Sequence, residues 1–258
     1  MSTIFEAQGL TKSFGGLTAV NDLSFSVEES EILGLIGPNG AGKSTVFSMM
    51  SGFVRPTSGE LVFEGRSIVG MPAYAVTGLG IGRVFQHSVS FNNLSVTENV
   101  VVGFHKERRA HILGSIARTR KARMEERAFR ERADEIIDMI GLGSVKDELP
   151  VNLPHGHQRL LSVATALATG PRLLLLDEPV TGMNPSETKH MVGLIRRIRD
   201  DGITVVLVEH HMKVVVDLCD RVVVLNYGRK IAEGTPRVVV DDPVVCEAYL
   251  GKRAFDAA

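Results

Sequence analysis

The stretch ILGLIGPNGAGKST, residues 32–45, decides the fold of this 258-residue chain. It joins the apolar run ILGLI to a glycine-rich loop that ends in Lys43, Ser44 and Thr45. A short apolar run bounded by glycine is typical of a buried strand. The stretch therefore predicts a strand, a glycine loop and a helix that begins near Lys43.

This arrangement points successive backbone N–H groups and the positive end of a helix at an anion, and it fits the phosphate-loop pattern GxxxxGK[ST]. The glycines let the backbone approach the anion, Lys43 places a charge against the β- and γ-phosphates, and the Ser44 hydroxyl is suited to Mg²⁺. The alternative is a glycine turn with a surface lysine, but the strand-to-helix setting favours the phosphate loop. We expect the nucleotide to be held by Gly37, Pro38, Asn39, Gly40, Ala41, Gly42, Lys43, Ser44 and Thr45.

A second constellation is LLLLDEP, in which an apolar run ends in Asp177 and Glu178. Parallel-sheet proteins build their sites at the ends of such strands. Asp177 is suited to the Mg²⁺ shell, and Glu178 to accepting a proton from an attacking water. Two acids after a strand also fit a helix start or a solvated loop, and Pro179 fits a simple strand end. The phosphate loop in the same chain favours the catalytic pair.

Six short apolar runs, separated by helical patterns, predict a largely parallel sheet covered by helices. They are ILGLI (32–36), LVFEG (61–65), IGRVF (81–85), RLLLLDE (172–178), ITVVLVE (203–209) and RVVVLNYG (221–228). No such run occurs between residues 95 and 154, where apolar residues recur at helical spacing and predict an inserted helical subdomain. These residues are Phe129, Ala133, Ile136, Ile137 and Ile140. Glutamates interrupt the basic run at 118–132, so a solvated helix face is favoured over a lipid or nucleic-acid patch.

Composition narrows the function classes. A hydrophobic content of 44% suffices for a sizeable core in one large domain or two small ones. The net charge of −1 gives no overall field toward nucleic acid or an anionic membrane. The 2 cysteines have no CxxC spacing, which argues against a disulfide scaffold and fits a reducing cytosol. The N-terminus lacks a signal-peptide pattern and no apolar stretch approaches the roughly 20 residues of a bilayer span, so we expect neither secretion nor membrane insertion.

Four histidines raise the question of a metal site: His155, His157, His210 and His211. The patterns HGH and HH lack the spacing and the carboxylate or thiolate neighbours of zinc sites. A role at the phosphates is therefore favoured for these histidines. For His210 alone, a strand-end histidine bonded to a neighbour is the alternative.

In the order of its motifs the chain resembles one family, the ATP-binding subunits of ABC transporters, over residues 5–251. Residues 37–45 look like Walker A, LLLLDE like Walker B and VTGMNP (180–185) like the D-loop. The resemblance implies that Phe14 stacks on adenine, that Gln86 is the Q-loop glutamine near Mg²⁺ and water, and that His210 is the switch histidine. Without it, Phe14 would be a core aromatic and Gln86 a polar strand end.

The signature loop of that family corresponds to LPHGHQ, residues 153–158, and departs from the usual LSGGQ. Pro154 stands where the family has a serine that donates a hydrogen bond to the γ-phosphate, and His155 replaces a glycine. Gly156 keeps the frame, and a helix that begins near it still presents amides to an anion. One lost hydrogen bond to a charged phosphate costs on the order of 1.5 to 3 kcal/mol, enough to slow hydrolysis.

The resemblance implies an α/β fold with a P-loop NTPase (RecA-like) core whose mixed sheet is mostly parallel, an N-terminal antiparallel β subdomain and an inserted α-helical subdomain. Residues 1–258 would form one ABC ATPase domain. Its core would span about 1–94 and 159–235, its helical subdomain about 95–158 and its C-terminal helical extension about 236–258.

The resemblance also implies an assembly. ATP and Mg²⁺ would lie between two ATPase chains, the second being a LivF-type subunit or another copy. Two transmembrane permease subunits would dock near residues 87–98, and a periplasmic or lipoprotein binding protein would deliver the cargo. The chain would lie peripherally on the cytoplasmic face of the plasma membrane and bind no nucleic acid.

Within the family, the chain looks like the LivG-type subunit of branched-chain amino acid importers. Importers of urea, amides or aromatic acids have similar ATPases and stay open as alternatives. A non-transport ABC ATPase is disfavoured, because one motif set is present and no long coiled coil follows Walker A. Glu178 and His210 argue against a module that senses ATP without hydrolysing it.

Overall fold

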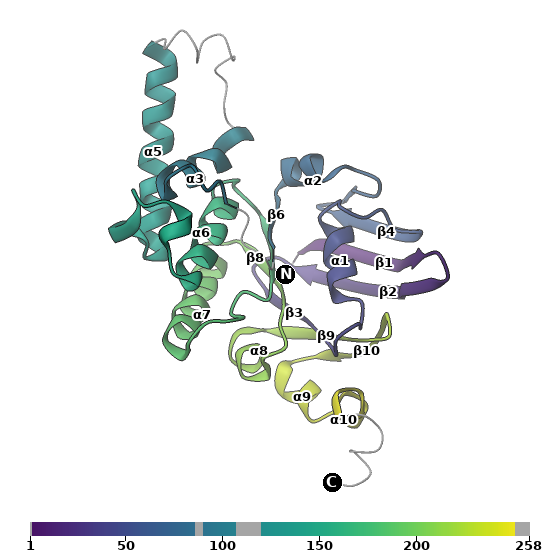
Figure 1. Ribbon diagram of the computed structural model, residues 1–258. Helices are drawn as coiled ribbons and strands as arrows, with labels where there is room; N and C mark the ends of the chain where they lie inside the picture. Colours follow the sequence, from purple (N-terminus) through teal and green to yellow (C-terminus); the bar gives the residue numbers. More distant parts are fainter. Residues whose placement is uncertain (1, 86–89, 107–119, 251–258) are drawn as a thin grey trace. The chain divides into compact units, whose positions relative to one another are not determined.

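The computed structural model describes residues 2–85, 90–106 and 120–250 (Figure 1). They form two compact units, each built from several stretches of the chain. Among the described residues, the first unit comprises 2–83, 172–179 and 192–250, and the second comprises 84–85, 90–106, 120–171 and 180–191. No described helix has the length and apolar character needed to cross a bilayer.

An antiparallel sheet in the first unit has the strand order β2-β1-β4-β5. Its strands are β1 (Thr3–Phe14), β2 (Leu17–Glu28), β4 (Ser58–Phe63) and β5 (Arg66–Ser67). The run LVFEG belongs here, so its assignment to the parallel sheet was wrong. Leu61 and Phe63 are buried while Val62 between them is half-buried, which is the alternation of a one-sided antiparallel strand. Five residues are too few to reveal that period in the sequence.

A second sheet has the order β10-β9-β3-β8-β7-β6 and contains the other five predicted runs. Its strands are β3 (Ile32–Ile36), β6 (Ile81–Val84), β7 (Leu173–Asp177), β8 (Thr204–Val208), β9 (Arg221–Asn226) and β10 (Arg229–Gly234). β3 pairs in parallel with β8 and β9, and β7 with β8, whereas β10 is antiparallel to β9. The central strands are buried on both faces, which explains their continuous apolar sequences. The expectation of a mixed, mostly parallel sheet beside an antiparallel one is confirmed.

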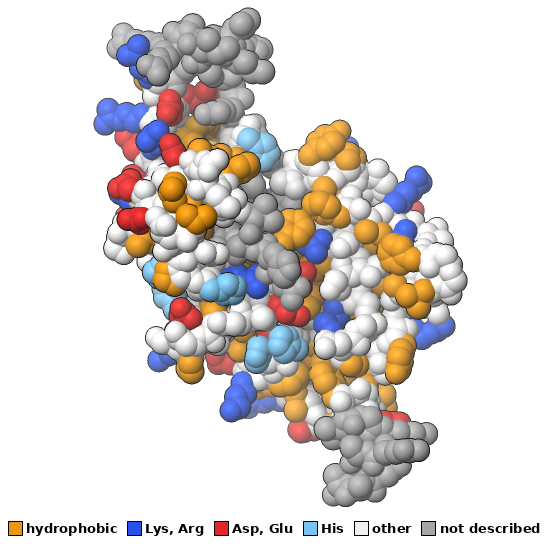
Figure 2. Space-filling view, in the orientation of Figure 1, with side chains coloured by type: hydrophobic (Ala, Val, Ile, Leu, Met, Phe, Trp, Pro, Cys, Tyr) orange, Lys and Arg blue, Asp and Glu red, His pale blue; other side chains and the backbone are white. Residues whose placement is uncertain are grey.

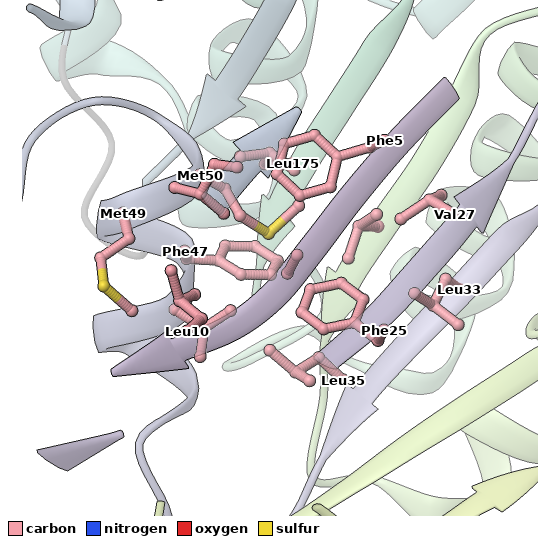
Figure 3. Close-up of a cluster of buried hydrophobic side chains, with 14 of the residues drawn as sticks. Phe5, Leu10, Phe25, Val27, Leu33, Leu35, Phe47, Met49, Met50 and Leu175 are labelled. Atoms are coloured by element: carbon pink, nitrogen blue, oxygen red, sulfur yellow. The ribbon is translucent and has the colours of Figure 1, made fainter. Parts of the chain in front are cut away.

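The helix α1 (Lys43–Met50) begins at the predicted residue and enters a core that both sheets share. Figure 3 shows Phe47 and Met50 of α1 in one buried cluster with Phe5 of β1 and Leu175 of β7. Phe47 and Met50 are fully buried, and each such side chain contributes about 1.5–3 kcal/mol on burial. The core therefore holds the start of α1, and with it the end of the glycine loop, in one position.

The remaining helices of the first unit are α2 (Ala73–Leu79), α8 (Met212–Leu218), α9 (Pro236–Val240) and α10 (Pro243–Leu250). The helix α7 (Pro185–Asp200) begins in the second unit and ends in the first. Cys219 is buried and Cys246 half-buried, and both are free thiols.

The second unit consists of helices and turns in its described part between residues 95 and 154, as predicted. Its helices are α3 (Val96–Gly103), α5 (Arg120–Ile140) and α6 (His155–Leu167), with short 3-10 turns at Phe104–Lys106, Gly143–Val145 and Pro150–Asn152. Phe129, Ala133, Ile137 and Ile140 of α5 are buried and Ile136 is half-buried. Exposed i,i+4 ion pairs, Arg127–Glu131 and Arg130–Glu126, occupy its other side, which supports the solvated-face interpretation. The face shown in Figure 2 likewise carries basic side chains interspersed with acidic ones rather than one basic field.

Candidate nucleotide-binding site

The loop between β3 and α1 has a backbone that only glycine fits at two positions. Gly37 has φ 147° and Gly42 has φ 104°, both in the region that favours glycine. A Cβ at Gly37 would lie 2.1 Å from the carbonyl oxygen of Leu225, and one at Gly42 would lie 2.5 Å from that of Ala19. Neighbouring backbone thus packs directly against the loop and fixes its path.

Lys43, the first residue of α1, folds over this loop. Its side chain is largely buried, and Nζ donates hydrogen bonds to the carbonyl oxygens of Gly37 (2.7 Å) and Pro38 (2.9 Å). Burial lowers the pKa of Lys43, while the nearby carboxylates of Glu178 and Asp177 act in the opposite direction. The structure therefore brings the phosphate-loop lysine and the two acids into one electrostatic environment, as the sequence predicts.

The other loop residues differ in exposure. Gly37, Ala41 and Lys43 are buried; Pro38, Gly42 and Thr45 are half-buried; Asn39, Gly40 and Ser44 are exposed. The Ser44 hydroxyl is thus accessible at the first turn of α1. Phe14, at the exposed end of β1, is 49% exposed with Lys12 Nζ 4.8 Å from its ring centroid, so it is not a core aromatic. Gln86 lies outside the described residues.

The two acids stand at the end of β7, where Asp177 is in register with Val208 of the parallel neighbour β8. The N–H of Glu178 donates to the carbonyl oxygen of Val208 at 3.0 Å, which ties the two strand ends together. Glu178 has φ 49°, a conformation unfavourable for a residue other than glycine. Such strain persists where the surroundings impose it, and it is frequent at functional sites.

His210 follows β8 and approaches Glu178 from the adjacent strand end. Its Nδ1 lies 3.7 Å from Oε1 of Glu178, and 45% of its side chain is exposed. An acid and an imidazole therefore share one edge of the sheet with the lysine of the phosphate loop. This is the constellation predicted for Glu178 and His210.

Arg83 of β6 is a member of this site that the sequence did not reveal. Its guanidinium NH2 group lies 3.3 Å from Oδ2 of Asp177, with side-chain exposures of 9% and 10%, and NH1 donates to Ser51 Oγ at 2.9 Å. Burial lowers the pKa of Arg83, and Asp177 opposes that effect. An arginine inside the apolar run IGRVF was the available signal. Arg83 therefore contacts the carboxylate that the sequence predicts for the Mg²⁺ shell.

Glu209 bears on the prediction that the histidines do not form a metal site. The prediction that the HH pair has no carboxylate neighbour was wrong, because ligand atoms of Glu209, His210 and His211 all lie within 4.8 Å of one another. Glu209 has no exposed surface and accepts hydrogen bonds from its neighbours. The sequence showed it only as an acid at a strand end.

The signature-like loop belongs to the second unit, at the start of α6. The helix begins at His155 with Pro154 as its N-cap residue, which makes no side-chain capping bond. A Cβ at Gly156 would lie 2.6 Å from Oε1 of Glu187, so glycine lets this acid approach the helix start. The Gln158 amide donates to the carbonyl oxygens of Pro150 and Leu153 and closes the loop.

A glycine loop between a strand and a helix, a buried lysine and carboxylates at the neighbouring strand ends define the chain as a P-loop nucleotide-binding protein. Sequence comparison identifies the family within this class of proteins. A family model described as ABC transporter matches residues 20–181, and one described as branched-chain amino acid ATP-binding cassette transporter matches residues 229–254. The chain belongs to the ABC transporter family and is an ATP-binding, ATP-hydrolysing subunit.

Several relatives match over nearly their whole length. The branched-chain amino acid transport ATP-binding protein BraF of Pseudomonas aeruginosa is 39% identical over 96% of this chain and 98% of its own. LivG of Escherichia coli, with the same description, is 37% identical over the same shares. The lipopolysaccharide export ATP-binding protein LptB of Haemophilus influenzae is 34% identical over 97% and 98%.

Solved structures agree on the fold. A nucleotide-free ATP-binding cassette from an ABC transporter has a TM-score of 0.85 and 28% identity, covering 97% of this chain and 100% of that one. A dimeric bacterial ABC transporter cassette has a TM-score of 0.78 and 25% identity, covering 91% and 99%.

Proposed function

We propose that this ATPase energises the import of branched-chain amino acids. The observation that carries the proposal is the match of residues 229–254 to a model specific for branched-chain amino acid cassettes, combined with full-length similarity to BraF and LivG. The export protein LptB is similar over the same length at lower identity, so the ATPase fold alone does not select the cargo.

In the proposed mechanism Glu178 accepts a proton from the attacking water, and His210 holds that water and the γ-phosphate in line. Lys43 and the loop amides bind the β- and γ-phosphates. The exposed hydroxyl of Ser44 and the carboxylate of Asp177, with Gln86, offer the oxygen ligands that Mg²⁺ prefers. When bound, Mg²⁺ neutralises charge on the phosphates.

The second unit supplies the other half of an ATP site. We propose that the loop at Gly156 binds the γ-phosphate held by a second ATPase chain, either a LivF-type subunit or another copy. Closure around ATP and reopening after hydrolysis would be transmitted to two permease subunits, served by a substrate-binding protein outside the membrane. Residues 95–158 would act as the helical subdomain, and the chain would lie on the cytoplasmic face.

The test is uptake of radiolabelled leucine, isoleucine and valine by cells that lack the chromosomal gene and carry either the wild-type gene or Lys43→Ala. Wild type should restore uptake, and Lys43→Ala should not, because loss of the phosphate charge weakens Mg-ATP binding. Calorimetry of the purified variant checks that cause. Unchanged uptake of all three amino acids in the deletion strain contradicts the cargo. Uptake of labelled urea, amides or aromatic acids by the same strains then identifies the alternative importer.

A further inference from the structure

Glu209 is a buried carboxylate to which the hydrolysis mechanism gives no task. It follows β8 directly and has no exposed surface. A buried carboxylate is costly unless hydrogen-bond donors compensate for lost hydration. The donors gathered around it therefore indicate what the fold uses this residue for.

Three of these donors come from the two residues that follow Glu209. Its Oε2 accepts the backbone N–H of His210 at 3.1 Å and that of His211 at 3.4 Å. The Nδ1 atom of His211 lies 3.2 Å from the same oxygen. Because this oxygen already accepts two amides, the His211 tautomer with N–H at Nδ1 completes a third hydrogen bond to it. A single oxygen thus fixes both the backbone that carries His210 and the ring of His211.

The ring of His211 in turn contacts the ring of His210. Their centroids are 4.2 Å apart with an interplanar angle of 36°. On its other side, Nδ1 of His210 faces Oε1 of Glu178 at 3.7 Å. The half-exposed His210 side chain is therefore held between a ring fixed by Glu209 and the carboxylate of Glu178.

We propose that Glu209 and His211 form a positioning pair that holds His210 at Glu178 for hydrolysis. Such a pair acts on the geometry of the reacting groups and not on the phosphate loop. It therefore affects kcat and leaves the KM for Mg-ATP unchanged. The inference rests on the proposed role of His210 and is independent of the cargo.

The test varies the Nδ1 donor of His211 and keeps the two backbone hydrogen bonds to Glu209. His211→Phe retains a ring against His210 but has no donor for Glu209, whereas His211→Asn retains a side-chain N–H near the Nδ1 position. Steady-state ATP hydrolysis of the full chain is measured with γ-labelled ATP, so that slow rates are resolved. We expect kcat to fall about fivefold in His211→Phe, the size of one hydrogen bond, and to return to within about twofold of wild type in His211→Asn.

A double-mutant cycle separates positioning from general stabilisation. In a His210→Ala background, His211→Phe should change kcat by less than about twofold, because the residue through which it acts is gone. An equal loss in both backgrounds, an unchanged kcat in His211→Phe, or a loss carried by KM overturns the proposal. If His210→Ala hydrolyses ATP normally, the assigned role of His210 is wrong and the positioning pair falls with it. A failure of amino acid uptake alone leaves both intact.

Discussion

Replacing Arg83 with methionine removes a guanidinium that lies buried beside Asp177. The two side chains are only 9% and 10% exposed, and the closest N–O distance is 3.3 Å. Arg83 also bonds to Ser51 and lies over the rings of Phe47 and Phe53 at 5.9 and 5.8 Å. Methionine preserves the apolar stem and deletes the charge, so the loss reports the polar and ring contacts of the guanidinium together.

Burial sets the expected magnitude. Removing one partner of a buried ion pair costs about 3–5 kcal/mol, because the remaining charge keeps its desolvation penalty. At this chain length such a loss lowers the melting temperature by roughly 10 °C. The exposed pair Arg196–Asp217 is the matched control: its N–O distance is shorter, 2.7 Å, but its side chains are 43% and 61% exposed. An exposed pair contributes about 0–1 kcal/mol.

The assay is urea unfolding of both variants without nucleotide, followed by circular dichroism, with m-values compared to confirm that the same surface unfolds. Arg83→Met should lose several times more free energy of unfolding than Arg196→Met. Arg83→Lys should fall between wild type and Arg83→Met, because it keeps the charge and loses the fork of donors. Equal losses for the two methionine variants, or a loss below about 1 kcal/mol for Arg83→Met, would refute the argument from burial.

Three further predictions address the chemistry and the fold. Glu178→Gln should retain ATP, hydrolyse it at least about 100-fold more slowly for want of a base, and accumulate as a closed dimer in size-exclusion chromatography; wild-type turnover would remove the assignment. Pro154→Ser adds a hydroxyl at the N-cap of α6, which should stabilise that helix by about 1 kcal/mol and hold ATPase activity constant or raise it up to about tenfold; a marked loss would mean that proline shapes the loop. Burial raises the pKa of Cys219 to about 12, so at pH 8 it stays a thiol and should resist alkylation until urea unfolds the chain; labelling of the native protein at the rate of half-buried Cys246 would contradict this.

The phosphate loop and the paired acids are predictable because their chemistry is local. A strand, three glycines and a lysine must be contiguous to surround a phosphate. Residues 32–45 alone therefore suffice to predict the strand, the loop and the first residue of α1. The paired acids at the end of β7 are equally predictable, because a strand that is buried on both faces is apolar until it reaches the polar edge of the sheet.

The antiparallel strands β1 and β2 are harder to predict from the sequence than the phosphate loop, for a physical reason. Their pairing contains several register shifts between residues 3 and 14, each of which breaks the two-residue alternation that marks a half-buried strand. The contacts of Arg83 and Glu209 could not be predicted from the sequence for a different reason. The partner of Arg83 lies 94 residues away in the sequence, and Glu209 is surrounded by donors that only the turn after β8 brings together. The role of Gly156 stays a prediction, because it depends on a second chain.

The left-handed backbone of Glu178 has a consequence for the engineering of this protein. Glycine relaxes this conformation, so Glu178→Gly should unfold at a higher temperature than the parent, and the proposed role of Glu178 as the base implies that this variant does not hydrolyse ATP. A screen for thermostable variants that ignores turnover would therefore enrich inactive protein at position 178.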